Sequence, residues 1–362
     1  MLNNKRLFMD VHVIQTLPPS NMNRDDSGSP KTAQYGGVRR ARVSSQAWKR
    51  AMRYYFIDNS EEELGVRTKH IVAYVAKQIC ELDNGISYQD AMQLAEQALE
   101  AAGLKIDKKE KLAKALFFLG KKQAVSLARA AIDNRDNMSD KKVKDVFRNL
   151  LGDNPEIDIA LFGRMVADNP ALNEDASAQV AHAISTHAVQ TEFDYYTAMD
   201  DQSPSDQAGA GMIGMIEYNS ATLYRYANVA VHELLRQIGD KNAVINVLKL
   251  FTEGFSNSLP TGKVNTFANQ TVPQAIMVNI RDDRPVSLVS AYEEPVKSVE
   301  GFVKKSVDKM FDELHRTEKF VHRPVATFYM SVNGDSGVEI GKEEADLAEL
   351  LEDLGKEFEI LL

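Results

Sequence analysis

The sequence predicts an α+β fold in which strands and helices alternate around a block of helices. Short segments rich in β-branched and aromatic residues recur along the chain, separated by segments with helical periodicity. Residues 60–150 carry helical signals almost throughout, which is typical of a helical insertion between elements of another domain. The acidic tail has apolar residues at helical spacing, as in a helix that packs one face on a core. These observations indicate an α+β core with appendages.

The chain begins with a strand-like segment and a long polar loop. Residues 6–16, "RLFMDVHVIQT", alternate in part between apolar and polar residues, and Pro18 and Pro19 are expected to end this strand. Residues 20–37 are rich in Asn, Asp, Ser, Gly and Pro, and this loop is long enough to be functional. A helix is expected to follow from about residue 45 to residue 56.

Beyond the helical block the periodicity changes several times, and no internal repeat is present. The arms "FDYYTAM" and "MIEYNSATLYRYANVAV" flank a Ser/Pro/Asp/Gly tip, which predicts a long β-hairpin over 193–231. The remaining expected elements are a helix over 177–188, a helix over 240–256, a strand over 275–281, a helix over 294–316 and a strand over 324–332. The apolar positions of the tail helix are Leu347, Leu350, Leu351, Leu354 and Phe358.

Composition favours an ordinary globular protein of the cytoplasm. Hydrophobic residues make up 44% of the chain and charged residues 26%, and no apolar run approaches the length of a spanning helix. Asp10 and His12 interrupt the apolar core that a secretory signal would need. The single cysteine, Cys80, excludes an internal disulfide and fits a reducing compartment. We expect no membrane segment, no cofactor and no metal.

The charge distribution inverts near the start of the chain. The whole protein has a net charge of -9, but the 30 residues from Arg24 to Arg53 contain eight Lys or Arg against two Asp. A local excess of positive charge in an acidic protein is the pattern expected of a surface that binds a polyanion. The alternative is a solvated basic face with no ligand.

The helix expected at residue 45 has two distinct faces. Ser44 and Ser45 are favoured N-cap residues, and the free N–H groups of a helix start attract phosphate. Before the helix, Arg40 and Arg42 alternate along an extended approach, and the polar loop carries Arg24 and Lys31. The cationic face, at i, i+3, i+4 and i+7, consists of Gln46, Lys49, Arg50 and Arg53. The opposite face, expected to dock into the core, consists of Trp48, Ala51, Met52 and Tyr55.

Two motif-like patterns fail their structural tests. Gly209, Gly211 and Gly214 fit G-x-G-x-x-G, but a polar loop precedes them and a strand-like segment follows, whereas a dinucleotide site needs a strand before and a helix after. His182 and His187 lie five residues apart and therefore miss the i, i+4 register of a zinc-binding helix. Packing in the core or at the base of the hairpin is their expected role.

Asp25 and Asp26 support the main enzymatic alternative. Paired carboxylates beside cations can hold Mg²⁺ for cleavage of a phosphodiester strand. The competing interpretation is that these acids orient Arg24 and Arg39 or cap their own loop. A third possibility is an oligomerising structural protein whose basic surface contacts acidic surfaces such as the C-terminal helix.

One resemblance is specific. Residues 23–53, "NRDDSGSPKTAQYGGVRRARVSSQAWKRAMR", resemble the signature of the CasC (Cse-type) backbone subunit of the type I-E CRISPR Cascade complex. The strings "DIALFGRM", "AHAISTH", "DYYTAMDD" and "YRYANV" match in the same order, so the resemblance extends from about residue 10 to about residue 292.

This resemblance implies an RRM-like (ferredoxin-like) palm, helical fingers and a β-hairpin thumb. The expected divisions are 1–57 for the first part of the palm with the basic loop and helix, 58–157 for the fingers, 158–192 for the return, 193–221 for the thumb, and 222–362 for the second part of the palm with the C-terminal helix.

The resemblance also implies a non-enzymatic role in antiviral defence. Copies of such a subunit stack along the CRISPR RNA (crRNA), and each thumb folds over RNA held by the neighbouring copy, so that the guide pairs with target DNA in segments. Implied partners are crRNA, target DNA through the hybrid, further copies of the chain, and the large, small, guide-5′-end and guide-processing subunits. Related backbone subunits in type III systems use a loop aspartate to cut target RNA, which keeps cleavage by Asp25 and Asp26 as the alternative.

Individual residues acquire roles by position in the matched motifs. The guide backbone would be held by Arg24, Lys31, Ser44, Gln46, Lys49, Arg50 and Arg53. Met165 would wedge at a kinked base, although its residue pattern alone suggests a core methionine. Tyr196 and Thr197 of the thumb would contact RNA on the adjacent copy. The apolar residues Met212, Ile213, Met215 and Ile216 near the tip indicate either a protein or base-stacking contact or a hairpin that packs on itself.

Overall fold

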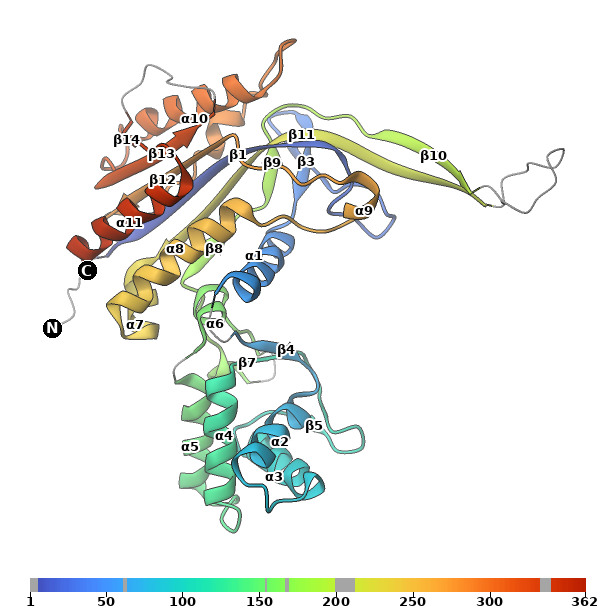
Figure 1. The fold of residues 1–362 in the computed structure, drawn as a ribbon, viewed down its shortest axis with the longest axis vertical. Coiled ribbons are helices and arrows are strands. Elements are labelled where there is room, and N and C mark those ends of the chain that lie inside the picture. The colour runs from blue at the N-terminus through green and yellow to red at the C-terminus, as the bar shows by residue number, and fades with distance from the viewer. Residues whose placement is uncertain (1–5, 61–63, 154, 167–168, 199–211, 333–339) are drawn as a thin grey trace. The chain divides into compact units, whose positions relative to one another are not determined.

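Two units, each with its own buried core, make up the protein in its computed structural model (Figure 1). The first consists of Met1–Tyr55, Val180–Asn228 and Leu248–Leu362, and the second of Phe56–Gln179 and Val229–Val247. The structure describes residues 6–60, 64–153, 155–166, 169–198, 212–332 and 340–362. Strands and helices are interleaved in these residues, which confirms the α+β class. Among the described helices, none has the length and apolar composition needed to cross a lipid bilayer.

The first unit is built on a mixed sheet around β1 (Phe8–Ser20). On one side of β1 lie, in order, β12 (Ala275–Arg281), β13 (Ala326–Ser331) and β14 (Lys342–Glu343). On the other side lie β11 (Met212–Ala230), β9 (Ala183–Ser185), β3 (Val38–Val43) and β2 (Thr32–Tyr35). β10 (Glu192–Ala198) pairs antiparallel with residues 212–218 of β11, which confirms the predicted hairpin. Residues 199–211, its predicted tip, lie outside the described part of the chain.

Helices cover this sheet and explain its apolar strands. All seven residues of β12 are buried, as expected for a central strand with both faces covered. Met310, Phe311 and Leu314 of α10 (Val303–Thr317) pack in one buried cluster with Ile14 of β1. The remaining helical elements of this unit are α1 (Ser45–Asn59, to residue 55), α8 (Lys241–Asn257, from residue 248), α9 (Val264–Phe267), a 3₁₀ turn (Val289–Tyr292) and α11 (Leu347–Leu361).

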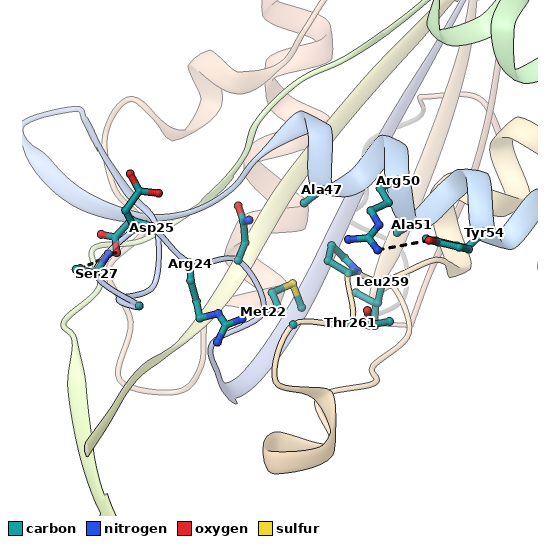
Figure 2. Close-up of a pocket in the computed structure, with 15 residues that line it drawn as sticks. Met22, Arg24, Asp25, Ser27, Ala47, Arg50, Ala51, Tyr54, Leu259 and Thr261 are labelled. Carbon is teal, nitrogen blue, oxygen red and sulfur yellow. Dashed lines mark hydrogen bonds between the residues drawn. The ribbon is translucent and has the colours of Figure 1, made fainter. Parts of the chain in front are cut away.

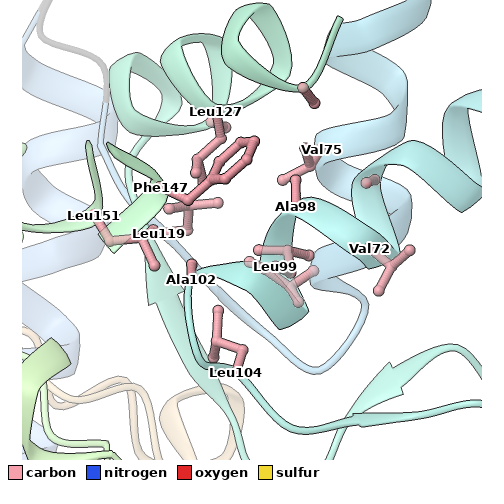
Figure 3. Close-up of a cluster of buried hydrophobic side chains, with 14 of the residues drawn as sticks. Val72, Val75, Ala98, Leu99, Ala102, Leu104, Leu119, Leu127, Phe147 and Leu151 are labelled. Carbon is pink, nitrogen blue, oxygen red and sulfur yellow. The ribbon is translucent and has the colours of Figure 1, made fainter. Parts of the chain in front are cut away.

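The second unit is mainly helical, as predicted for residues 60–150. Its core lies between α2 (Ile71–Leu82), α3 (Tyr88–Ala101), α4 (Lys121–Asp133) and α5 (Lys141–Gly152) (Figure 3). Phe147 of α5 lies beside Leu127 of α4 in this core, while alanines such as Ala98 let the helices approach closely. The other elements are β4 (Val66–Thr68), β5 (Ile106–Asp107), β6 (Leu112–Ala113), β7 (Phe117–Leu119), α6 (Ile157–Phe162), a 3₁₀ turn (Pro170–Leu172), β8 (Ala178–Val180) and α7 (Val231–Ile238).

Three sequence predictions about elements are wrong, besides the strand β2 that forms within the expected loop of residues 20–37. The helix expected over 177–188 is replaced by β8 and β9, because Thr186 and Ala181 donate their backbone N–H groups to β11 carbonyls instead. β1 continues to Ser20 through the two prolines. Its pairing with β12 ends at Ile14, so the missing proline N–H groups remove no bond to that strand.

The third error concerns the start of α10, which begins at Val303 rather than near residue 294. Pro295 and Gly301, the latter with φ +95°, interrupt the segment before it. The strands predicted over 275–281 and 324–332 and the helices over 240–256 and in the tail are present, with their ends shifted by a few residues at most.

A row of buried polar groups crosses the sheet beneath α10. Asp10 is fully buried and accepts hydrogen bonds from the Tyr226 hydroxyl (2.8 Å) and the Val286 N–H (2.9 Å). His12, also fully buried, accepts at Nε2 from the Asn279 amide (3.2 Å), which fixes a neutral ring that donates from Nδ1 to the Tyr224 hydroxyl (2.9 Å). Burial raises the pKa of Asp10 to about 7 and lowers the pKa of His12 to about 3.

These two pKa shifts predict opposite dependences of stability on pH. The contribution of Asp10 is full below its ordinary pKa of 3.8 and is lost as the pH rises toward 7, whereas that of His12 is lost as the pH falls below 6.5. Between about pH 4 and 6.5 the change in the Asp10 contribution with pH cancels the change in the His12 contribution. Asp10→Asn should therefore make the free energy of unfolding fall by about 1.4 kcal/mol per pH unit on acidification, relative to the unmodified protein.

Denaturant titrations at several pH values between 4.5 and 6.5 measure this difference in slope. His12→Asn provides the matched comparison, because it leaves only Asp10 and should give the opposite sign. Equal slopes in the two variants would contradict the assignment of protonation states.

Candidate nucleic-acid interface

The start of helix α1 is held by its own N-cap and by two other segments. The Ser44 hydroxyl accepts from the Ala47 N–H (3.3 Å), as an N-cap does, and the Ser44 N–H donates to the side chain of Asn23 (2.8 Å). The Ser45 N–H donates to Nδ1 of His182 (3.0 Å). Ser44 is almost fully buried, so its hydroxyl serves the helix cap. The polar loop and the segment before β9 thus set where the helix begins.

The apolar face of α1 is anchored as the sequence predicted. Trp48 and Met52 are completely buried. The guanidinium of Arg225, from β11, lies 3.7 Å from the centre of the Trp48 ring and is itself 1% exposed. Arg225 donates to the Gln15 side chain and to the Phe255 carbonyl. A cation stacked on tryptophan therefore holds the helix against the sheet.

The cationic face of α1 points outward along most of its length. Gln46 and Arg50 are exposed, and Arg53 is partly exposed. Lys49 is half-buried, and this burial lowers its pKa. Arg50 donates to the hydroxyl of Tyr54 one turn later (3.4 Å), and its guanidinium lies 5.4 Å from the centre of that ring. The helix therefore presents cations beside an exposed aromatic ring.

The polar loop before α1 is held by hydrogen bonds of its own and carries exposed Arg24. Asp25 Oδ1 accepts hydrogen bonds from the Ser27 hydroxyl (2.7 Å), the Ser27 N–H (2.9 Å) and the Ser29 N–H (3.1 Å). These bonds lower the pKa of Asp25, and the bond from the Ser27 hydroxyl has the largest effect. Gly28 adopts φ +91° within this turn. Asp25 thus caps its own loop, which was one of the two alternatives. In the described residues no group of three His, Cys, Asp or Glu side chains could hold a metal ion.

The hairpin of β2 and β3 brings two of the predicted arginines to different environments. Gly36 and Gly37 have φ +57° and +76°, the conformation of a two-residue type I′ turn. A Cβ on Gly36 would lie 1.6 Å from the Glu293 carbonyl oxygen, so only glycine fits there. Arg42 is partly exposed and donates to the Thr32 carbonyl (3.2 Å).

Arg40 does not lie where the sequence argument placed it. Its side chain is fully buried and donates to the carbonyls of Tyr35 (3.1 Å), Ser185 (3.1 Å) and Tyr292 (2.7 Å). The guanidinium joins three segments of the first unit, and burial lowers its pKa. We therefore correct the prediction: Arg40 is an interior structural residue, whereas Arg42 remains available to a ligand.

Two further cations, Lys31 and Arg42, lie near His182 at the start of α1. Burial lowers the pKa of His182, and the positive charges of Arg42 and Lys31 lower it further, so these three side chains lie near one another. His187 is buried instead, stacks on Phe302 at 3.7 Å between ring centres, and accepts from a β11 N–H. Neither His182 nor His187 lies in a helix. Of the glycine motif, Gly214 lies in a strand, and its other two glycines fall outside the described residues.

A pocket of about 640 Å³ opens between the polar loop, α1 and residues 259–262 (Figure 2). Figure 2 shows Arg50 and Tyr54 at one end and Asp25 at the other, with Met22 and Leu259 between them. Its polar groups include cations from both the loop and the helix. Sequence reasoning found the cations but missed Tyr54 and the 259–262 segment, because only tertiary structure brings that distant loop here.

The predicted RNA contacts outside this region are exposed. Met165 in the second unit has 83% of its surface exposed, although residue patterns alone indicated a core position. The preceding Arg164 is buried and donates to the carbonyls of Leu172, Phe118 and Leu151, which holds this turn in place. Burial lowers the pKa of Arg164 to about 10. The buried Arg164 therefore holds the backbone beside Met165, whose side chain lies in solvent.

The hairpin carries a stripe of exposed apolar side chains. Tyr196 is 39% exposed and lies over Gly214, where a Cβ would come within 2.3 Å of its ring, and Thr197 is exposed. The antiparallel register places Tyr195 opposite Met215, and Thr197 opposite Ile213, on one face of the ribbon. The exposed large apolar residues of this face are Phe193, Tyr195, Ile213 and Met215. This face has no cover among the described residues.

Comparisons with known proteins place the chain in a family. The family model described as "CT1975-like protein" matches residues 9–356. A chain in a structure titled "CRISPR RNA-guided surveillance complex, pre-nicking" has 30% sequence identity and a TM-score of 0.83, with 97% of this chain and 100% of that chain covered. A chain in a structure titled "CRISPR RNA-guided surveillance complex" has 27% identity and a TM-score of 0.73, with 96% and 99% covered. None of the curated proteins compared with the chain matches it.

These matches confirm the resemblance to a Cascade subunit that the sequence motifs indicated, and they agree in covering nearly the whole chain. The protein belongs to the CT1975-like protein family.

Proposed function

We propose that this protein is the crRNA-binding backbone subunit of a type I-E CRISPR surveillance (Cascade) complex. In this role copies of the chain polymerise along the guide RNA and present it for pairing with target DNA. The similarity over 97% of the chain to a subunit of an RNA-guided surveillance complex supports the assembly. The motif "NRDD" to "KRAMR" of residues 23–53 supports the specific type.

The observation that carries the proposal is the placement of the basic segment. In a protein of net charge -9, α1 is anchored by a buried tryptophan while exposed Arg50 and partly exposed Arg53 face outward. Arg24, Lys31 and Arg42 lie in the loop and hairpin that precede the same helix. Backbone phosphates of a single strand can contact such a surface without any reading of sequence. The proposed phosphate-binding residues are Arg24, Lys31, Arg42, Gln46, Lys49, Arg50 and Arg53. Ser44 is buried, and its hydroxyl caps the helix that carries four of them.

In the same proposal the sheet of the first unit forms an RRM-like palm, residues 58–157 the fingers and residues 193–221 the thumb. Exposed Met165 would wedge between bases where the strand kinks, since apolar side chains can enter an unstacked step. Tyr196 and Thr197 would contact RNA on the neighbouring copy. The exposed apolar stripe of the hairpin gives the thumb a surface for that contact.

We propose that the chain does not itself cut nucleic acid. The nuclease alternative requires Asp25 and Asp26 to hold a metal, and three hydrogen bonds from its own loop already occupy Oδ1 of Asp25. The similarity to chains of RNA-guided surveillance complexes supports a scaffold and not a nuclease. In this proposal the chain acts in the cytoplasm. Its partners are crRNA, target DNA and the large, small, guide-5′-end and guide-processing subunits.

Assembly on RNA tests the scaffold function. The isolated chain should run as a monomer or a weak, polydisperse oligomer in size-exclusion chromatography with light scattering. Addition of an RNA of guide length should convert it to a complex with several copies per RNA. A single monomeric species with and without RNA would contradict the proposal.

The nuclease alternative has its own test. The assembled complex is incubated with complementary RNA or DNA and Mg²⁺, and products are resolved on a denaturing gel. We expect intact strands, and cuts at regular spacing that disappear in Asp26→Asn would favour the alternative.

A further inference from the structure

The proposed phosphate contacts account for the cations of the pocket beside α1. They do not account for its apolar and aromatic lining. We propose that this pocket binds one unstacked base of single-stranded RNA, with the base stacked on Tyr54 and its phosphate near Arg24 and Arg50. The inference rests on the proposed RNA-binding function and specifies how the same site would hold one nucleotide.

The lining combines an apolar floor with an aromatic wall. Met22, Leu259 and Pro260 line the pocket together with Ala51, which packs on the core side of α1. Tyr54 is 53% exposed, so its ring keeps a large apolar surface in water. A base that stacks on such a ring removes that surface from water, and every base has a face that can do so.

The Arg50–Tyr54 pair is held in position for this contact. The Arg50 guanidinium donates to the Tyr54 hydroxyl and lies 5.4 Å from the ring centre. The hydrogen bond and the cation–π contact orient the Tyr54 ring, while the rest of the ring surface stays exposed. A planar guanidinium beside an aromatic ring can contact both a base and its phosphate.

The opposite wall is preformed by the polar loop. Asn21, 1% exposed, donates to the carbonyls of Gly28 (2.9 Å) and Glu217 (2.8 Å), and this ties the loop to β11. A Cβ on Gly262 would lie 2.2 Å from the Met22 carbonyl oxygen, so the two loops that form the floor are in direct contact. A rigid pocket binds a base with little loss of conformational freedom.

The charges within the pocket indicate how a nucleotide is oriented. Figure 2 shows Asp25 at the end away from Tyr54, with its carboxylate turned to Ser27, while Arg50 lies next to Tyr54. A phosphate is therefore favoured at the Arg50 end and disfavoured near the acids. The volume of about 640 Å³ lies in the range of small-molecule sites and accommodates a nucleotide.

Tyr54→Ala tests the stacking contact. Loss of one base-stacking contact should lower the affinity for a single-stranded oligoribonucleotide by about 5- to 100-fold. The slope of log affinity against log salt should stay unchanged, because no phosphate contact is removed. Tyr54→Phe should keep most of the affinity. Tyr88 in the second unit has a similar exposed fraction (58%) and provides the control. Tyr88→Ala should leave the affinity for the oligoribonucleotide unchanged.

Photocrosslinking locates the base directly. An oligoribonucleotide with 5-iodouridine at successive positions is bound to the full chain, irradiated and mapped by mass spectrometry. A crosslink at Tyr54 is expected and should be lost in Tyr54→Ala.

The outcomes separate this inference from the proposed function. If RNA binds with a steep salt dependence but Tyr54→Ala keeps full affinity and no crosslink forms at Tyr54, the pocket inference fails and the backbone role stands. If Tyr54→Ala weakens self-association without RNA, a second copy occupies the pocket and the inference also fails. If no RNA binds at all, the proposed function itself is wrong.

Discussion

Alanine substitution of Lys49, Arg50 and Arg53 should reduce the affinity for single-stranded RNA by about 50-fold at 0.15 M salt. Each cation near a phosphate releases condensed counterions, and three contacts on a single strand account for a salt slope of about 2. The variant should therefore bind more weakly and also less steeply with salt. Alanine favours helix, so α1 should persist in the variant. Fluorescence anisotropy at several salt concentrations measures both quantities.

The control removes the same charge from another helix. Lys304, Lys309 and Arg316 lie on α10 and contact Asp308, the Glu294 carbonyl and Glu313 respectively. Their replacement by alanine changes the net charge equally and should leave the salt slope unaltered. If both triple variants lose affinity to the same degree, overall charge and not the α1 surface controls binding, and the proposed interface is wrong.

Trp48→Ala should destabilise the protein more than any single surface change. Truncation of a completely buried aromatic residue costs about 3–5 kcal/mol. Here it also removes the ring on which buried Arg225 stacks, so a cation is left beside a cavity. We expect a lower denaturant midpoint and, under conditions where the variant is folded, weaker RNA binding because α1 loses its anchor.

Tyr54→Ala on the same helix is the matched control for stability. Tyr54 is half exposed, and its removal should change the free energy of unfolding by no more than about 0.5 kcal/mol. Trp48→Phe should fall between the two, since it keeps an aromatic ring under Arg225. A Trp48→Ala midpoint equal to that of Tyr54→Ala would show that the helix is not anchored through this residue.

Local sequence patterns were sufficient to predict the elements whose buried residues repeat with the period of a helix or a strand. The buried face of α1, the hairpin arms and the tail helix could be predicted, because alternation or helical spacing reports directly which side meets a core. The Ser44 cap is likewise encoded in adjacent residues. The Gly36–Gly37 turn lies in the segment that was expected to be a loop, although two adjacent glycines are typical of a type I′ turn.

Other positions depend on partners far away in the chain. The sequence offers no local reason why Arg40 is buried and Arg42 partly exposed, since both lie on one strand two residues apart. The difference comes from the carbonyls of Ser185 and Tyr292, which close around Arg40 alone. Residues 177–188 form strands because β11 supplies hydrogen-bond partners that a helix would not use.

The chain by itself determined the α+β class, the inverted charge of residues 24–53 and the family motifs, because composition and short-range spacing express all three. Tertiary structure alone decided which cations reach solvent, that Met165 is exposed, and that Leu259 and Tyr54 share a pocket with Arg24. The exposure of a side chain and the meeting of side chains in one pocket depend on contacts between segments separated by up to 252 residues, and no local pattern records such contacts.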